Sequence, residues 1–89
     1  MSQEALITLD LQYSTDEQRE DFDKKLKEIN WIKIDNLSTA WKTYFDINER
    51  KKIITILQNG IAAAKNYSKV NKVYYAIQVG KEKIEINNI

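Results

Sequence analysis

The sequence predicts a small α+β domain in which strand, helix, strand, strand, helix and strand follow one another, with a short extra strand at the C-terminus. Three observations predict it. Four stretches alternate apolar with polar residues or are rich in β-forming residues, as in half-buried strands. Two stretches between them have apolar residues at spacings of three and four, as in helices. The 89 residues contain no proline and two glycines, so nothing suggests a linker, and one domain over residues 1–89 is expected.

The first strand and helix follow from alternation and from a capping pattern. Residues 5–11 alternate and predict a strand that carries Asp10 near its C-terminal end. Ser14 and Glu17 then fit a capping box, which predicts a helix near residues 15–29.

Two neighbouring strands come next. Residues 31–35 and 39–45 alternate again, and the short polar segment between them is typical of a turn. We therefore expect these two strands to pair in antiparallel orientation.

The second half of the chain repeats the pattern of helix and strand. Residues 46–49 fit a second capping box, with Asp46 leading, and predict a helix near residues 47–66. Residues 73–79 predict a strand, and residues 84–86 the short additional strand.

This order of elements is the split βαβ, or ferredoxin-like, plan. Right-handed crossovers place both helices on one face of a four-stranded antiparallel sheet and leave the other face, here called the open face, to a partner, a ligand or solvent. The positions expected to face the helices are Ile7, Leu9, Ile32, Ile34, Val73, Ile77 and Val79. Those expected on the open face are Leu6, Thr8, Asp10, Trp31, Lys33, Asp35, Tyr74, Ala76 and Gln78. In the third strand either Trp41, Thr43 and Phe45 or Ala40, Lys42 and Tyr44 take the open face.

Composition excludes several kinds of chemistry. The chain has no cysteine and no histidine, which excludes disulfides, thiolate or imidazole zinc sites, cysteine nucleophiles and Ser-His-Asp triads. No apolar run approaches the roughly 18 residues of a membrane span, so we expect no membrane contact and a cytoplasmic location.

Residues 1–49 carry 11 acidic and 6 basic residues, and residues 50–89 carry 2 acidic and 8 basic ones. The basic half suits nucleic acid or an acidic partner, although a lysine-rich composition explains it equally well.

Aromatic and polar residues together on an open face have three interpretations: a platform on which bases stack, a dimer interface, or a partly solvated structural face. RNA-recognition motifs have such a base-stacking platform, and its aromatic residues belong to a glycine-containing consensus on the third strand. Residues 39–45 contain no glycine and space their aromatics differently.

A resemblance adds a functional expectation. Asp10 ends the first strand, a polar turn and a charged helix follow, and a two-strand unit opens with Trp31 and contains residues 37–41, Leu-Ser-Thr-Ala-Trp. This arrangement resembles the small ferredoxin-like nucleases grouped around the CRISPR-associated spacer-acquisition protein, the virulence-associated protein D toxins and the GhoS-type RNA-cleaving antitoxin. The resemblance implies a homodimer in which carboxylates of two subunits face each other and hold a divalent metal. It also implies that the extra strand braces the neighbouring subunit.

The chemistry that this resemblance implies is metal-dependent cleavage of RNA or DNA in a defence or toxin–antitoxin system. Asp10 is the candidate catalytic residue and ligand of Mg²⁺ or Mn²⁺, which would polarise a phosphate and activate water. Asp35 and Ser38 are weaker second candidates. The basic residues expected to contact phosphates are Lys33, Lys42, Arg50 and Lys51. In the alternative interpretation, Asp10 caps the turn before Ser14.

The alternative function is a non-catalytic protein-interaction module, an antitoxin or inhibitor that binds a protein through the open face or an edge strand. A homodimer is expected with either function. Apolar side chains on the open face are costly to expose to water, and a two-fold dimer is the commonest way to cover them. Ile84, Ile86 and Ile89 are expected to pack on a sheet edge of the same chain or of its partner.

Overall fold

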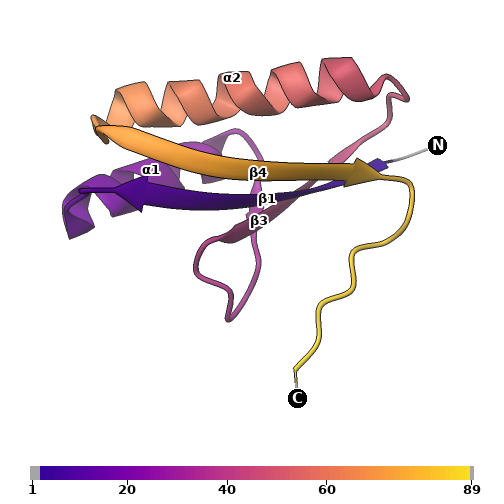
Figure 1. The fold of residues 1–89 in the computed structure, drawn as a ribbon, viewed down its shortest axis with the longest axis horizontal. Coiled ribbons are helices and arrows are strands. Elements are labelled where there is room, and N and C mark those ends of the chain that lie inside the picture. The colour runs from indigo at the N-terminus through magenta and orange to yellow at the C-terminus, as the bar shows by residue number, and fades with distance from the viewer. Residues whose placement is uncertain (1–2, 89) are drawn as a thin grey trace.

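A four-stranded antiparallel sheet with two helices on one face forms the molecule (Figure 1). The computed structural model describes residues 3–88. The elements are β1 (Gln3–Gln12), α1 (Asp16–Glu28), β2 (Ile32–Lys33), β3 (Ala40–Phe45), α2 (Arg50–Ser68) and β4 (Lys72–Gly80). The strand order is β2-β3-β1-β4, so the predicted ferredoxin-like βαββαβ fold is confirmed.

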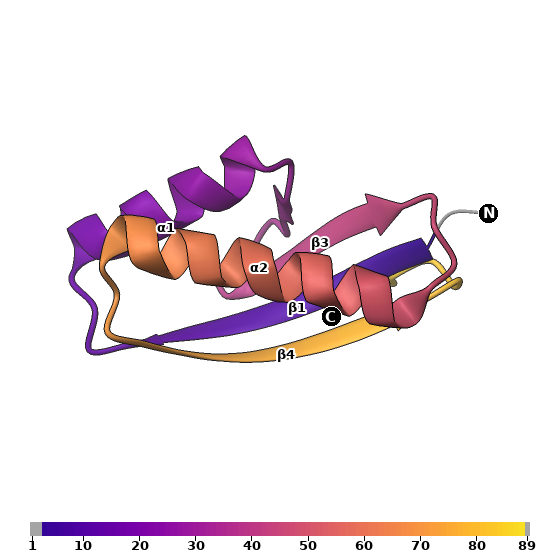
Figure 2. The same ribbon diagram turned by 90° about the horizontal axis from the view of Figure 1, so that it is seen from above.

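The central strand β1 is longer than its neighbour β3. β1 pairs with β4 as far as Gln12, whereas its register with β3 ends at Thr8. One more backbone bond, from the N–H of Leu9 to the carbonyl of Thr39 at 2.9 Å, closes this side of β1. Figure 2 shows β1 and β4 running on beyond the start of β3, below α1. We call the space beside residues 10–12 the notch.

The helices begin at other caps than those predicted. Thr15, not Ser14, is the N-cap of α1, and its capping box is completed by Gln18 rather than Glu17. The predicted capping box of Ser14 and Glu17 was therefore wrong by one residue. The Ser14 hydroxyl does not cap the helix, because it donates to the carbonyl of Leu11 at 3.2 Å.

The second capping box was also wrong. α2 begins at Arg50, and its N-cap Glu49 makes no side-chain capping bond. The side chain of Glu49 is instead 3.3 Å from Lys52, one turn further along the helix.

The core lies between the sheet and both helices. Its fully buried members come from β1, β3 and the inward stripes of the two helices; the largest are Trp41, Phe22, Ile7, Leu26, Ile53 and Leu57. The predicted alternation of β1 and β4 is confirmed, because Ile7 pairs with Ile77 on the helix side and Asp10 with Tyr74 on the open face.

The two alternatives for β3 are resolved. Trp41 and Thr43 are buried, and Trp41 belongs to the core, so this set faces the helices together with Phe45. Lys42 and Tyr44 therefore lie on the open face.

In β2 the predicted faces were wrong. Trp31 is 5% exposed and belongs to the core, whereas Ile32 is 43% exposed and pairs with Lys42 on the open face. The cause is the end of α1. Asn30 adopts a left-handed backbone, with φ of 69°, and the N–H of Trp31 donates to the carbonyl of Leu26 at 3.0 Å, which turns the Trp31 ring inward.

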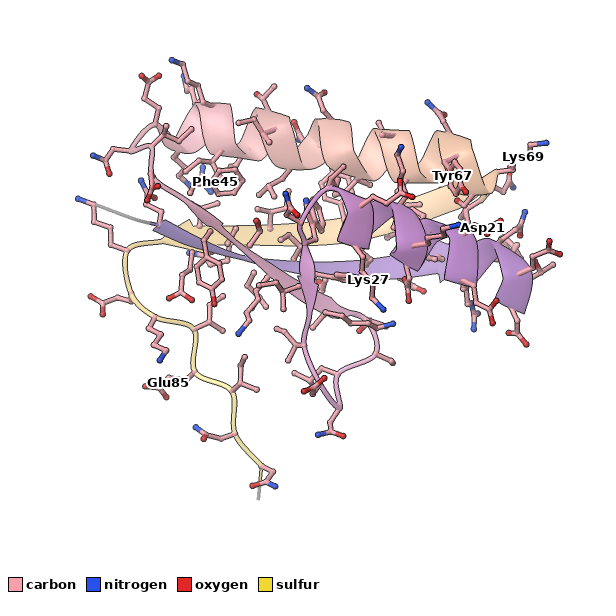
Figure 3. The ribbon with its side chains drawn as sticks, turned by 180° about the vertical axis from the view of Figure 1, so that it is seen from behind. Asp21, Lys27, Phe45, Tyr67, Lys69 and Glu85 are labelled. Carbon is pink, nitrogen blue, oxygen red and sulfur yellow. The ribbon has the colours of Figure 1, made fainter. Side chains whose placement is uncertain are left out.

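The predicted C-terminal strand does not form within this chain. Residues 81–88 have no regular structure and leave the end of β4 on the side of the sheet opposite the helices (Figures 1 and 3), where the side chain of Glu85 also lies. Ile84 is half-buried and Ile86 is exposed, while Ile89 lies outside the described residues. A three-residue strand adds too few contacts to hold a segment that contains four charged residues.

Candidate functional site

Asp10 lies on the open face of β1, three residues before the turn into α1. Its carboxylate is exposed and accepts a hydrogen bond from Nε2 of Gln12 at 2.7 Å. Its cross-strand neighbour on β4 is Tyr74. Within residues 3–88 Asp10 makes no capping bond to the following turn, which Ser14 closes through Leu11. The alternative role as a turn cap is therefore wrong.

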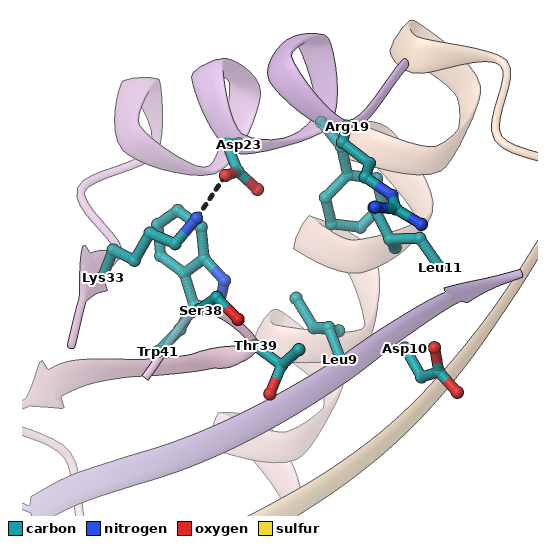
Figure 4. A pocket seen from close by; sticks show the side chains of 10 residues that line it. Leu9, Asp10, Leu11, Arg19, Asp23, Lys33, Ser38, Thr39 and Trp41 are labelled. Carbon is teal, nitrogen blue, oxygen red and sulfur yellow. Dashed lines mark hydrogen bonds and ion pairs between the residues drawn. The ribbon is translucent and has the colours of Figure 1, made fainter. Parts of the chain in front are cut away.

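A cavity of about 290 Å³ fills the notch between α1, β1 and the loop before β3 (Figure 4). We call it the notch cavity. It is lined by Leu9, Asp10, Leu11, Arg19, Phe22, Asp23, Lys33, Ser38, Thr39 and Trp41. The structure thus brings three of the predicted residues, Asp10, Lys33 and Ser38, to one place. The apolar side chains form the base of this cavity, and the polar groups form its rim.

A second hollow adjoins the notch cavity on the open face. It is lined by Thr8, Leu9, Asp10, Thr39, Tyr74, Tyr75 and Ala76. Leu9, Asp10 and Thr39 belong to both hollows, because β3 ends beside them. The hollow that contains Tyr74 and the notch cavity therefore adjoin at these three residues.

Lys33 is already engaged by neighbouring groups. Its ammonium is 2.5 Å from the Asp23 carboxylate of α1, and both side chains are about 30% exposed. The same ammonium lies 5.4 Å from the centre of the Trp41 ring. The pair fixes β2 to α1 and neutralises both charges, so Lys33 contributes little net charge for the predicted phosphate contact.

The other predicted residues lie apart from Asp10. Arg50 and Lys51 begin α2 at the opposite end of the sheet, where the Gln3 side chain donates to the carbonyl of Ile47. Gln3 and Asp10 are seven positions apart along β1, or roughly 23 Å at about 3.3 Å per residue. Asp35 is exposed in the loop between β2 and β3, outside the notch cavity.

Two lysine–tyrosine pairs occupy the open face. Lys42 lies 6.0 Å from the ring centre of Tyr44 on β3, and Lys72 lies 5.0 Å from that of Tyr74 on β4. The two tyrosines are 50% and 54% exposed. Sequence reasoning predicted Tyr74 on this face but identified neither pair, although the repeated Lys-x-Tyr spacing was a visible signal.

Sequence reasoning also missed Arg19. The chain has 14 basic residues, of which Arg19 and Arg50 are the two arginines. Nε of Arg19 donates to Oγ of Ser14 at 3.0 Å, which places the guanidinium next to Leu11 above the notch cavity (Figure 4). In the sequence Arg19 belongs to an ordinary charged helix face and gives no signal.

The donor set tests the predicted metal site. No group of three or more acidic side chains that could hold a cation is found within residues 3–88. Asp10 has an amide, Gln12, beside it, and Asp23 is paired with Lys33. The carboxylates of one chain therefore do not fit a resident Mg²⁺ or Mn²⁺; a shared site would need Asp10 from a second subunit.

The described part of the chain has no helix long and apolar enough to cross a membrane. Comparisons with protein-family models, with curated proteins and with solved structures find no match for this chain.

Proposed function

We propose that this protein binds single-stranded nucleic acid, RNA or DNA, on the open face of its sheet. The observation that carries the proposal is the presence of two exposed lysine–tyrosine pairs, Lys42–Tyr44 and Lys72–Tyr74, on strands either side of β1. A tyrosine ring offers a surface on which any base can stack, worth about 1–3 kcal/mol per base, and the adjacent ammonium can meet a phosphate.

The spacing of the two pairs suits an extended strand. Tyr44 is level with Glu4 of β1 and Tyr74 with Asp10, so the two tyrosines are six positions, or roughly 20 Å, apart along the direction of β1. This distance accommodates a few successive nucleotides, near the lower end of the roughly 4–16 that a domain of similar size covers.

Charge alone does not hold the ligand in this proposal. Lys42 and Lys72 are balanced on the open face by Glu4 and Asp10. Stacking and hydrogen bonding therefore supply most of the affinity, and the binding should depend only weakly on salt. The aromatic positions also differ from those of an RNA-recognition motif, because β1 contributes none.

Cleavage by a metal-loaded homodimer stays a prediction from the resemblance, since of the two candidate carboxylates Asp10 lines the notch cavity and Asp35 lies outside it. A second candidate function, protein binding, is favoured by a different observation. β4 is a nine-residue strand at the edge of the sheet, and its outer backbone groups are available to a strand from another protein.

The experiment measures fluorescence anisotropy of labelled RNA and DNA strands of about 10 nucleotides. Tyr44→Ala and Tyr74→Ala should each weaken binding roughly 5- to 100-fold, which corresponds to about 1–3 kcal/mol. The matched control is Tyr67→Ala. Tyr67 is also about half exposed and also lies under a lysine, Lys25 at 5.6 Å, but on α2.

Retained binding in Tyr67→Ala, together with loss in the two open-face variants, supports the proposal. Absence of binding by the wild type, or an equal loss in all three folded variants, contradicts it. Circular dichroism confirms that each variant is folded.

A further inference from the structure

The notch exposes a backbone donor. Alternate residues of an antiparallel strand direct their backbone groups to the same neighbour, so the N–H of Leu11 points to the same side as that of Leu9. Leu9 reaches the carbonyl of Thr39, but β3 and its loop offer Leu11 no acceptor, and no backbone bond from Leu11 to that side is found within residues 3–88. This N–H lies at the notch cavity, which Leu11 lines.

Arg19 is held above the same place. The hydroxyl of Ser14 donates a hydrogen bond to the carbonyl of Leu11. The same hydroxyl oxygen accepts a hydrogen bond from Nε of Arg19, at 3.0 Å. This chain of bonds anchors the guanidinium at Nε and leaves its two Nη groups for a ligand. Two parallel N–H groups match two oxygens of a phosphate, a geometry that lysine does not provide.

The remaining polar groups at the rim favour an acceptor-rich ligand. Ser38 and Thr39 add two hydroxyls from the loop before β3. The charges of Asp23 and Lys33 cancel in their ion pair. The carboxylate of Asp10 projects on the other side of β1 from Leu9, away from α1 (Figure 4). An anion beside Arg19 therefore meets donors on the α1 side of β1, whereas the carboxylate of Asp10, which also lines the cavity, lies on the other side of the strand.

We infer that the notch cavity binds the terminal phosphate of the strand whose bases lie on the open face. This inference rests on the proposed function. A terminal rather than an internal phosphate is expected because Phe22 and Trp41 close the base of the cavity and its volume, about 290 Å³, is at the lower end of the range for small-ligand sites. The hollow that contains Tyr74 shares Asp10 and Thr39 with this cavity, so the last base and its phosphate can occupy adjoining sites.

The test compares three RNA strands of one sequence, with a 5′-phosphate, a 3′-phosphate or neither. The wild type should bind one phosphorylated strand about tenfold more tightly than the unphosphorylated strand, and this identifies the end that is bound. Arg19→Gln should abolish the difference, and Arg19→Lys should remove most of it because the paired donors are lost. Both variants should bind the unphosphorylated strand as the wild type does. Lys24→Gln, which removes one exposed charge from α1 outside the cavity, is the control.

A second measurement separates this inference from the proposed function. Inorganic phosphate and a nucleoside monophosphate are titrated into ¹⁵N-labelled protein, and the amide of Leu11 should move in both titrations. If that amide moves although no strand binds, the phosphate site is supported and the proposed function falls. If the wild type binds all three strands equally and the Leu11 amide does not move, the phosphate site is overturned while the proposed function stands.

Discussion

Replacing Gly60 with alanine sets helix propensity against packing at the contact between α2 and the end of α1. Gly60 is a buried residue in the middle of α2. A Cβ atom there would lie 3.0 Å from Cδ1 of Ile29 and 3.2 Å from Cζ2 of Trp31. Both distances are shorter than an ordinary contact, so a neighbouring side chain must shift. The glycine therefore permits close packing of α2 against the connection between α1 and β2.

The two effects are similar in size. Alanine should stabilise the helix by about 1 kcal/mol relative to glycine. Overpacking of a core typically costs about 1–3 kcal/mol. Ile29 is partly exposed and its terminal methyl can rotate away, whereas the Trp31 ring is buried and cannot. We therefore expect a net loss of about 1 kcal/mol, or roughly 4–8 °C in Tm for a domain of this size.

Urea and thermal unfolding followed by circular dichroism measure this change. Ala63→Gly, at an exposed position of the same helix, calibrates the propensity effect and should destabilise by about 1 kcal/mol. In an Ile29→Ala background, Gly60→Ala should remain destabilising, because the close contact with the buried Trp31 ring is still present. A Gly60→Ala protein that is more stable than the wild type by the full propensity gain would refute the packing argument.

Three further predictions concern the site and the assembly. Asp10→Asn should abolish any RNA cleavage in Mg²⁺ or Mn²⁺ and change the unfolding free energy by less than about 1 kcal/mol, because an amide oxygen can still accept from Gln12; equal cleavage by both proteins, or none by either, contradicts a catalytic Asp10. A double-mutant cycle with Asp23→Ala and Lys33→Ala should give a coupling of about 0.5–1 kcal/mol for this half-buried pair, and a coupling near zero would show that it does not fix β2 to α1. Two chains should associate through the edge of β4, so light scattering at micromolar concentration should give about twice the 10.5 kDa mass of the chain. A monomeric mass would contradict the predicted dimer.

The long strands and both helices were predictable because their patterns are complete. Residues 5–11 have an apolar residue at every odd position, and a strand with one buried face has a single register that satisfies such a pattern. β2 was not predictable in the same way. It has two residues, and the left-handed turn at Asn30 and the hydrogen bond from Trp31 to Leu26 decide which side faces the core. A tertiary connection therefore outweighed the alternation of Trp31 and Ile32.

The candidate site was predictable in part for a similar reason. Asp10 was found because it stands at the end of a clear strand, and Lys33 and Ser38 because they lie in the paired-strand unit. That they share a cavity depends on where β3 stops, which alternation does not reveal. Arg19 was not found, because its function as a donor depends on Ser14, five residues earlier and outside the helix.

The difference in length between β1 and β3 is what creates the site. β1 has ten residues and β3 six, and the loop before β3 is closed by bonds from the N–H of Ile34 to the carbonyl of Ala40 and from the N–H of Ala40 to that of Leu37. This tight closure makes β3 begin at Ala40, so within residues 3–88 no strand pairs with residues 10–12 on that side of β1. If β3 extended back to residue 37, the carbonyl of that residue would lie opposite Leu11 and accept its N–H. The short β3 therefore leaves a donor uncovered beside Arg19, at the one end of the open face where Tyr74 and Asp10 also lie.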